Sequence, residues 1–556
     1  MEKARLFMAI ALSFLVFFLW NVFFVEKETV EPPTAKTQAP QLTSEEMVQK
    51  QAPIMEKEEG FGKKEQLAEK EEVKPVKTAR TIQVNTPLYT VKISEKGSAI
   101  KSFVLKRYRE QVELDSPLKE IVSKNMPDGT LLMGFAGKSI PGLDRAVFSA
   151  DLPYDSVDIV YDSEPLIFSW VSPNGIVVKK EFFFSPETYL IGLTISVKNN
   201  SNEALRDNLV LSLKSTSSGQ KSRFGFEGPS LLLNNKLEQI KMKKIEEKNI
   251  YSGKLGWIAL QDRYFMSSII SEKNEEASMR LFLKPDHILE AEFLQPEQVI
   301  QPGSEHFFDF KLFFGPKSMT ILNDLGYNLG KAVNFGMFDF IAKPCVWLMN
   351  FFYRFIPNYG VAIIILTLMT KALLWPLGSK SYKSMSEMKK LQPLIAELKE
   401  KYKNDRKKIQ QETMALYKTY KINPLGGCLP MVAQIPVFFA LYRMLYESIE
   451  LRHAPFFGWI YDLSAPDRLF RFGFSIPFME PPYGIPVLTI IMGASMLLQQ
   501  RMSPPPGDPA QAKMMMLMPI IFTVIFINFS SGLVLYWLVN NVLSISQQYY
   551  VSKKTA

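Results

Sequence analysis

The feature that most constrains the fold is a long apolar run with a charged residue inside it. Residues 360–380 read GVAIIILTLMTKALLWPLGSK, which is long enough to cross a bilayer as a helix. If the cytoplasmic end lies near Gly378, Lys371 lies roughly 10 Å up the helix at about 1.5 Å per residue. Such a charge either snorkels to the membrane surface or faces a water-filled pocket with a function. The run alone leaves both interpretations open.

Composition indicates one soluble domain combined with a membrane domain. The chain has 556 residues, a net charge of +9, and 47% hydrophobic and 12% aromatic residues, which is unlike a single globular domain. Its three histidines are scattered, and no hydrolase, metalloprotease or nucleotide-binding motif has a supporting context. We therefore expect no enzyme, metal or cofactor. The basic clusters adjoin apolar runs, so the positive-inside rule explains them better than nucleic-acid recognition does.

The N-terminus predicts an uncleaved membrane anchor. Residues 1–25 place basic residues before about twenty mostly apolar ones, which fits a spanning helix that starts in the cytoplasm. The run ends in bulky residues, among them Trp20 and Phe24, rather than in the small residues of a cleavage site. Residues 26–80 are rich in Glu, Lys, Gln and Pro and cannot bury enough apolar surface to fold, so we expect a disordered tether outside the membrane.

Residues 81–316 predict a β-sandwich outside the membrane. Short runs of strand-forming residues, such as LYTVKIS and IVVKKEFFFS, recur between turn signals such as SPNG at 172–175. Such folds often bind sugars. Trp170, Trp257 and Tyr264 either line a cleft or belong to the core and its rim, and the sequence leaves both open.

Residues 317–359 are expected to link this domain to the membrane. Within them, residues 341–356 are apolar and aromatic, with Lys343 and Arg354 near the ends and Pro344 near the start. This segment is short for a span and precedes a much stronger one. It therefore predicts an interfacial helix that lies on the outer membrane surface.

Five further spans are expected in the C-terminal part, which makes six with the anchor. They are the segments 360–378, 424–446, 484–500, 514–529 and 532–550, with loops at 379–423, 447–483 and 501–513 and a tail at 551–556.

Charge assigns sides to these loops. Residues 379–423 carry twelve Lys or Arg against five Asp or Glu, which places this loop in the cytoplasm. The loop at 447–483 leans acidic and aromatic, and the tail ends in lysines. Both termini should therefore lie inside and residues 26–359 outside. Cys345 and Cys428 then lie on opposite sides of the membrane and cannot form a disulfide with each other.

The cytoplasmic loop predicts an antiparallel helical hairpin. Apolar residues recur at helical spacing on both sides of a turn at Asn404-Asp405, where Asn suits a helix C-terminus and Asp an N-cap. The apolar positions are Met385, Met388, Leu391, Ile395 and Leu398 before the turn, and Ile409, Leu416 and Tyr420 after it.

Polar residues recur inside the expected spans, several of them in the cytoplasmic half. In spans such residues face a bundle interior or a cavity. We expect a polar vestibule that is open to the cytoplasm and closed outside, with hydrogen bonding between helices as the alternative. The residues are Thr367, Thr370, Lys371, Gln434, Gln499, Gln500, Asn540, Asn541 and Ser544.

Several ordered motifs resemble those of the bacterial YidC-type membrane protein insertases, in the YidC/Oxa/Alb family. The most specific motifs are NPLGGCLP at 423–430 and SGLVLYW at 531–537, and GVAIIILTLMTKALLWPL, ELRHAPFFGWIYDLSAPD and KMMMLMPIIF accompany them in order. The resemblance covers about residues 340–551. Residues 81–316 are loosely similar to the large periplasmic domain of Gram-negative members, a β-supersandwich like the sugar mutarotases.

The resemblance implies an α-helical polytopic inner-membrane protein with a five-helix insertase core, a periplasmic domain and a cytoplasmic hairpin. Such proteins insert nascent membrane proteins into the phospholipid bilayer, alone or with the Sec translocon, without ATP or a cofactor. Lys371 occupies the position of the family's groove arginine, Thr367 and Tyr536 would touch substrate, and Gln434 would line the groove. Tyr536-Trp537 replaces a Tyr-Tyr pair that is found in many members. The tail SKKTA is short, so ribosome contact should be weak.

The residues suggest a physical mechanism. A hydrated groove offers polar partners to the hydrophilic flank of a substrate, and the apolar span then partitions into lipid. Met385 and Met388 would add an adaptable contact surface on the hairpin. Two alternatives stay open. A secondary transporter would require an internal repeat, which the five later spans do not show, and a sugar-acting protein would require carboxylates that converge in a β-domain cleft.

Overall fold

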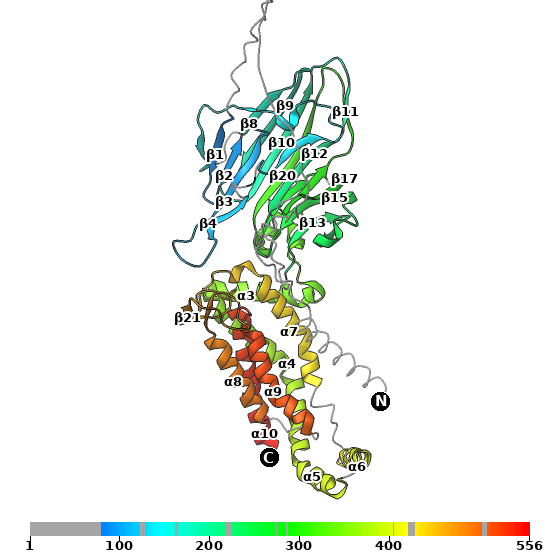
Figure 1. Ribbon diagram of the computed structural model, residues 1–556, viewed down its shortest axis with the longest axis vertical. Helices are drawn as coiled ribbons and strands as arrows, with labels where there is room; N and C mark the ends of the chain where they lie inside the picture. Colours follow the sequence, from blue (N-terminus) through cyan, green and yellow to red (C-terminus); the bar gives the residue numbers. More distant parts are fainter. Residues whose placement is uncertain are drawn as a thin grey trace, which may run out of the picture. The chain divides into compact units, whose positions relative to one another are not determined.

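The computed structural model describes residues 79–556, apart from 123–125, 127, 162–164, 217–224, 274, 285–286, 404, 421–428, 503–508 and 556. The expected anchor at 1–25 and nearly all of the tether at 26–80 lie outside the described residues. Cys428 and Asn404 lie outside them as well. The described chain begins with strands and ends with helices, as Figure 1 shows.

A five-stranded sheet opens the β-domain. Its strands pair antiparallel except at one edge, where β1 and β7 are parallel. In spatial order they are β4 (Leu118–Val122), β3 (Ala99–Arg109), β2 (Tyr89–Ser94), β1 (Thr81–Asn85) and β7 (Ser156–Asp158).

The second sheet has 13 strands among the described residues, and neighbouring strands in it pair antiparallel. Its main path runs β5 (Leu132–Phe135), β12 (Leu209–Thr216), β18 (Ile288–Leu294), β17 (Glu276–Lys284), β15 (Ile250–Gln261), β16 (Phe265–Ser271), β20 (Glu305–Pro316), β10 (Leu190–Asn199), β9 (Ile176–Phe184), β8 (Leu166–Val171) and β6 (Ser149–Ala150), with β13 (Gly228–Leu233) and β14 (Lys236–Gln239) beside β15. A separate pair joins β11 (Leu205–Asp207) to β19 (Gln298–Ile300).

The long strands alternate in burial, so one face of each carries apolar residues into the core. In β9 the residues alternate between buried and partly exposed along most of the strand, which is the period of two expected of a half-buried strand. Trp257 is fully buried, Trp170 packs against Phe148, and Tyr264 lies under the Arg263 guanidinium. These aromatic residues therefore belong to the core of the domain and its rim, and Trp257 lines no cleft.

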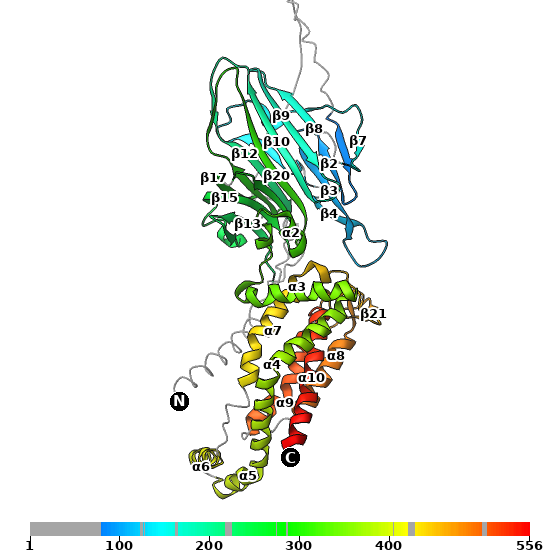
Figure 2. The same cartoon turned by 180° about the vertical axis from the view of Figure 1, so that it is seen from behind.

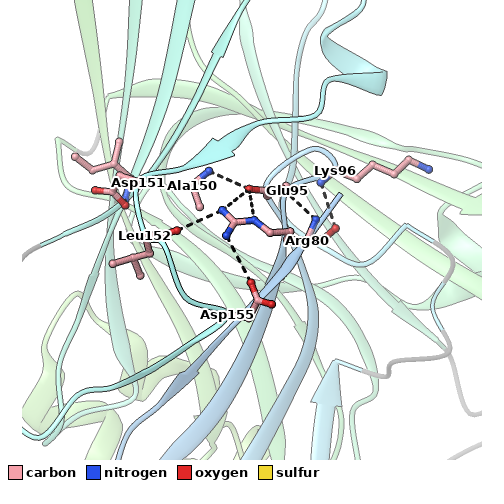
Figure 3. Close-up of polar contacts among 9 residues, drawn as sticks. Arg80, Glu95, Lys96, Ala150, Asp151, Leu152 and Asp155 are labelled. Carbon is pink, nitrogen blue, oxygen red and sulfur yellow. Dashed lines mark hydrogen bonds and ion pairs between the residues drawn. The ribbon is translucent and has the colours of Figure 1, made fainter. Parts of the chain in front are cut away.

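A buried carboxylate, Glu95, binds two segments of the β-domain that are far apart in the sequence (Figure 3). The side chain of Glu95 is inaccessible to solvent and accepts hydrogen bonds from the backbone N–H and guanidinium of Arg80 and from the N–H of Ala150. Burial alone would raise the pKa of Glu95, but these hydrogen bonds outweigh it and hold the pKa below its usual value. Arg80 also bonds to the Leu152 carbonyl and pairs with Asp155. The carboxylate thus ties the start of the domain to the segment at 150–155.

After β20 the chain becomes helical. Short helices lead into α3, and five longer helices follow with a hairpin between the first two. The elements are α2 (Met319–Leu325), α3 (Asp339–Phe355), α4 (Tyr359–Lys390), α5 (Gln392–Lys401), α6 (Arg406–Thr419), α7 (Leu429–Glu447), α8 (Val487–Met502), α9 (Pro509–Phe526) and α10 (Ser531–Thr555), together with the strands β21 (Leu469–Phe472) and β22 (Tyr483–Ile485). Short 3₁₀ turns in this described part lie at Leu329–Ala332, Gly336–Phe338 and Ile449–Leu451, and two more, at Leu143–Arg145 and Met242–Lys244, belong to the β-domain.

Helices α4, α7, α8, α9 and α10 pack beside one another, while α3 crosses them (Figures 1 and 2). Among the described helices, α4 alone meets a strict test of length and apolarity for crossing a membrane, and Met514–Phe526 is a shorter apolar stretch. The count of six spans therefore remains a prediction.

Helix α4 extends beyond the segment that the sequence predicts as its membrane span. The segment 360–378 was expected to end before the hairpin, but α4 continues to Lys390. No residue between 379 and 390 is a proline or glycine, whereas Pro393 lies in the first turn of α5 and disfavours helix in the residue before it. Met385 and Met388 therefore lie on α4, and the hairpin consists of α5 and α6. Asp405 caps α6 by accepting a hydrogen bond from the N–H of Lys408.

Polar contacts join the β-domain and the start of α2 to the last turn of α7 and the segment that follows it. The Arg263 guanidinium, between β15 and β16, donates to the Tyr446 carbonyl, and Arg452 donates to the carbonyls of Arg109 and Glu110. Ser318 donates to the carboxylate of Glu450. These contacts connect two separate segments of the β-domain, and the N-cap of α2, with one end of the helical bundle.

Candidate functional site

The site is built on the face of α4 that packs against α10. Asn358 starts α4 by accepting a hydrogen bond from the N–H of Val361, a standard N-cap. Ile363, Thr367 and Lys371 then follow at intervals of four residues, so they share one face of the helix. A Cβ on Gly532 would touch Ile363, and Lys371 reaches Ser544 further along α10. The two helices therefore run in the same direction.

Lys371 is held by a hydroxyl and not by a carboxylate. Its Nζ donates to Ser544 Oγ at 2.6 Å, and its side chain is half-buried. In the described part of the chain no ion pair involves Lys371. Helix α10 contains no acidic residue, and the first in α4 is Glu387. The positive charge thus lies between two helices without an anionic partner.

Polar residues of α10 reach three different helices. Asn540 accepts a hydrogen bond from Gln434 Nε2 of α7 at 2.8 Å. Asn541 donates to Ser495 Oγ of α8 at 3.0 Å. Together with the contact between Ser544 and Lys371 of α4, these contacts make α10 the polar centre of the bundle. These polar residues therefore form hydrogen bonds between helices, which is the alternative to an open vestibule that the sequence analysis named.

Gln547 joins α10 to α4 near the C-terminal end of their contact. Its Nε2 donates to the Trp375 carbonyl and to Ser379 Oγ. A side chain at Gly378 would collide with Gln547, since a Cβ there would lie 2.9 Å from its amide. Sequence analysis missed Gln547 and Ser379. The helical spacing of 540, 544 and 547 could have revealed Gln547, because those positions share a face.

The other residues expected to line the groove make contacts within their own helix or pack among aromatic side chains. Thr367 and Thr370 bond to carbonyls of their own helix, and Thr367 is buried. Tyr536 is also buried, while Trp537 packs against Phe438, Phe522 and Phe526. A substrate would reach Thr367 and Tyr536 only after the helices part. Met385 and Met388 are half-buried near the end of α4, away from this cluster in the sequence.

Nothing in the described part of the chain suggests metal chemistry. No group of three His, Cys, Asp or Glu residues there could hold a metal ion. The free Cys345 is buried within α3.

Comparison with known proteins gives concordant matches over both parts of the chain. Residues 351–556 match the family model of the 60Kd inner membrane protein, and residues 81–348 match that of the YidC periplasmic domain. The membrane protein insertase YidC of Syntrophus aciditrophicus is 43% identical over 477 residues, which is 85% of each chain. That of Syntrophobacter fumaroxidans is 40% identical over 567 residues and covers all of both chains. A crystal structure of an active YidC insertase aligns at 19% identity over 85% of this chain and 93% of its own, with a TM-score of 0.37.

Proposed function

This chain belongs to the YidC family of membrane protein insertases, and we propose how the arrangement of its helices supports insertion. It is an inner-membrane insertase with a periplasmic domain, its substrates are nascent membrane proteins, and its function is not enzymatic. Membership in this family favours insertion over the transporter and sugar-acting alternatives.

The observation that carries the mechanism is the positive charge of Lys371 without an anionic partner. In the resting bundle Ser544 satisfies one N–H of the ammonium group, which leaves its charge uncompensated. An acidic group on the hydrophilic flank of a substrate would gain Coulomb energy by replacing that hydroxyl. The charge therefore attracts the flank that has to cross the membrane.

The polar contacts around Lys371 are suited to exchange. A hydrogen bond between membrane helices contributes on average about 0.6 kcal/mol, so separating Gln434 from Asn540 or Lys371 from Ser544 costs little. Once they are separated, the same groups offer donors and acceptors to the substrate backbone, which would otherwise be unsatisfied in hydrocarbon. The groove thus opens when hydrogen bonds between the helices break and the same groups bind the substrate instead.

The final step is partitioning of the apolar span into lipid. On the insertion scale each Leu or Ile at the centre of a span contributes up to about 0.6 kcal/mol, so a typical span needs no fuel. We propose the following topology for the core: six spans, with α5 and α6 in the cytoplasm beside the emerging chain. The hairpin, Met385 and Met388 would meet the substrate or the Sec translocon, and the short tail at 551–556 would contact ribosomes only weakly.

Photocrosslinking during translation tests this groove. A photoreactive amino acid at Gln434, at Thr370 or at Tyr536 should capture a small nascent membrane protein whose translocated flank is halted midway. The matched control is Leu498 of α8, an exposed position on a helix that does not touch Lys371. Capture at Leu498 that equals capture at the three groove positions would contradict a route along α4 and α10.

A further inference from the structure

The loop between α7 and α8 exposes a cluster of phenylalanines that the insertion mechanism does not use. The hairpin of β21 and β22 spans residues 469–485, in which Phe470, Phe474 and Phe478 are 68%, 64% and 79% exposed. Arg471 and Glu480 are its only charged residues. Exposed aromatic clusters of this kind mark contact with a membrane or another protein.

Hydrogen bonds hold the β21–β22 hairpin against the segment that directly follows α9. Arg468 donates to the Ile527 carbonyl, just after α9, and to the Pro482 carbonyl within the hairpin. Asn528 donates to the Phe478 carbonyl at 2.8 Å and accepts from the N–H of Glu480 at 2.8 Å. The hairpin therefore cannot lift away from the end of α9 without losing these bonds.

A buried carboxylate fixes the other side of the hairpin. Asp467 accepts a hydrogen bond from the N–H of Leu488 in the first turn of α8, at 2.6 Å, and another from Trp459. Burial raises the pKa of Asp467, whereas these hydrogen bonds and the charge of Arg468 act against that shift. The first turn of α8 and the base of the hairpin thus form one unit.

The exposed aromatics continue into apolar surface on the bundle. Ile485 at the end of β22 and Ile490 and Ile491 on α8 are also exposed. Both views in Figures 1 and 2 place β21 at the level of α3 along the bundle, and α3 itself exposes Trp347 and Phe355. Aromatic side chains concentrate at membrane–water interfaces.

We propose that the β21–β22 hairpin inserts Phe470, Phe474 and Phe478 into the interface of the outer leaflet. Its occupant is the phospholipid surface, because the hairpin is bound to helix ends at that level and is continuous with the exposed apolar flank of α8. Insertion would keep the outer ends of α8 and α9 at a constant depth while the opposite ends of the bundle move.

The test measures depth in the full-length protein reconstituted in phosphatidylethanolamine–phosphatidylglycerol vesicles. With both native cysteines replaced by serine, Phe474→Cys carries an environment-sensitive fluorophore, and lipids spin-labelled near the headgroup are compared with aqueous iodide as quenchers. Lipid quenching should reach at least half of that at Ile490→Cys on α8. Iodide quenching should be at least threefold weaker than at Tyr161→Cys, an exposed site on the β-domain. Phe478→Cys repeats the measurement in case one variant folds poorly.

Two results would overturn the proposal. Strong iodide quenching with no lipid quenching at both hairpin positions would place the phenylalanines in water. Protection from both quenchers, together with disulfide crosslinking between two Phe474→Cys chains, would assign the surface to a second copy of this protein.

Discussion

Lys371 is the residue whose chemistry sets the clearest expectation. If its uncompensated charge attracts an acidic flank, Lys371→Arg should retain insertion, and Lys371→Glu should impair substrates with acidic flanks because attraction becomes repulsion. Lys371→Ala should fall between them, with a defect that grows as flank carboxylates increase from zero to two. Insertion of one substrate that carries zero, one or two such carboxylates provides the measurement.

Ser544 supplies a matched control for this series. Ser544→Ala removes the hydroxyl that Lys371 contacts and keeps the charge, so it should leave the dependence on flank charge intact. A response to Lys371→Ala that does not vary with flank charge would remove electrostatic attraction from the mechanism. It would leave groove hydration and partitioning to account for insertion.

Glu95 gives an expectation for the β-domain that depends on pH. Its pKa in the folded protein lies below the ordinary value of 4.5, so its stabilising effect is complete above that value and disappears as the pH falls through the folded pKa. Glu95→Gln should lower the free energy of unfolding by about 1–2 kcal/mol at pH 7, an amount reduced by the partial exposure of Arg80. The difference in unfolding free energy between the wild type and Glu95→Gln should shrink as the pH is lowered.

Pulse proteolysis of the full-length protein across a urea series at pH 7 and pH 4 measures this gap. Glu297→Gln, at an exposed carboxylate, serves as the control and should change little at either pH. A Glu95→Gln defect of equal size at both pH values would show that the charge of Glu95 is not what stabilises the domain.

At the scale of elements, α8 and α9 approach each other through Gly493. A Cβ at this position would lie 2.2 Å from Thr523 Oγ1 and 3.2 Å from both Thr523 carbons, and Thr523 is itself bonded to the Pro519 carbonyl. Close approach through small residues is a principal source of packing between membrane helices. Gly493→Val should therefore force the helices apart and cost about 1–3 kcal/mol.

Thermal unfolding in detergent, followed by fluorescence, detects this cost as a lowered Tm. Thr523→Ala removes the obstructing hydroxyl and methyl, so the double variant should recover part of the loss. Equal Tm values for Gly493→Val and the wild type would mean that α8 and α9 pack less closely than the structure indicates.

Sequence patterns were informative wherever one residue type decides a local conformation. Asp405 caps α6, as the sequence predicts. Helix α4 continues past the segment 360–378 because apolarity stops near Gly378 while helix propensity does not. Hydrophobicity reports the membrane boundary, whereas Pro393 and the residues before it determine where the helix ends.

The polar residues were identified from the sequence, but their pairing was not. Gln434, Asn540 and Asn541 each lie inside an apolar segment, which makes them conspicuous. Which helix each one faces depends on the rotation of α10 against its neighbours, and a single sequence does not encode that rotation locally. Gln547 and Ser379 lie at the margin of their segments, where polar residues are ordinary, so composition did not single them out. Only the helical spacing of Gln547 from Asn540 and Ser544 marks it.

At the scale of the whole molecule, the proposed topology places the β-domain and the α5–α6 hairpin on opposite sides of the membrane. Tyr161 on the β-domain and Glu400 on α5 are both exposed. In a background without native cysteines, a membrane-impermeant thiol reagent should label Tyr161→Cys in cells permeabilised only at the outer membrane. Glu400→Cys should react only after the inner membrane is opened. Labelling of both in cells with an intact inner membrane would refute the topology.

Helix α4 has a mechanical consequence that follows from its length and from one proline. Its 32 residues span roughly 48 Å at about 1.5 Å per residue, which exceeds a hydrocarbon core of about 30 Å. The protruding end is therefore a lever arm with α5 attached to it. Pro376 removes one backbone hydrogen bond within α4, so the helix bends most easily about one turn beyond Lys371. We expect a force on the α5–α6 hairpin to separate Gln547 from Ser379 before it separates Ser544 from Lys371.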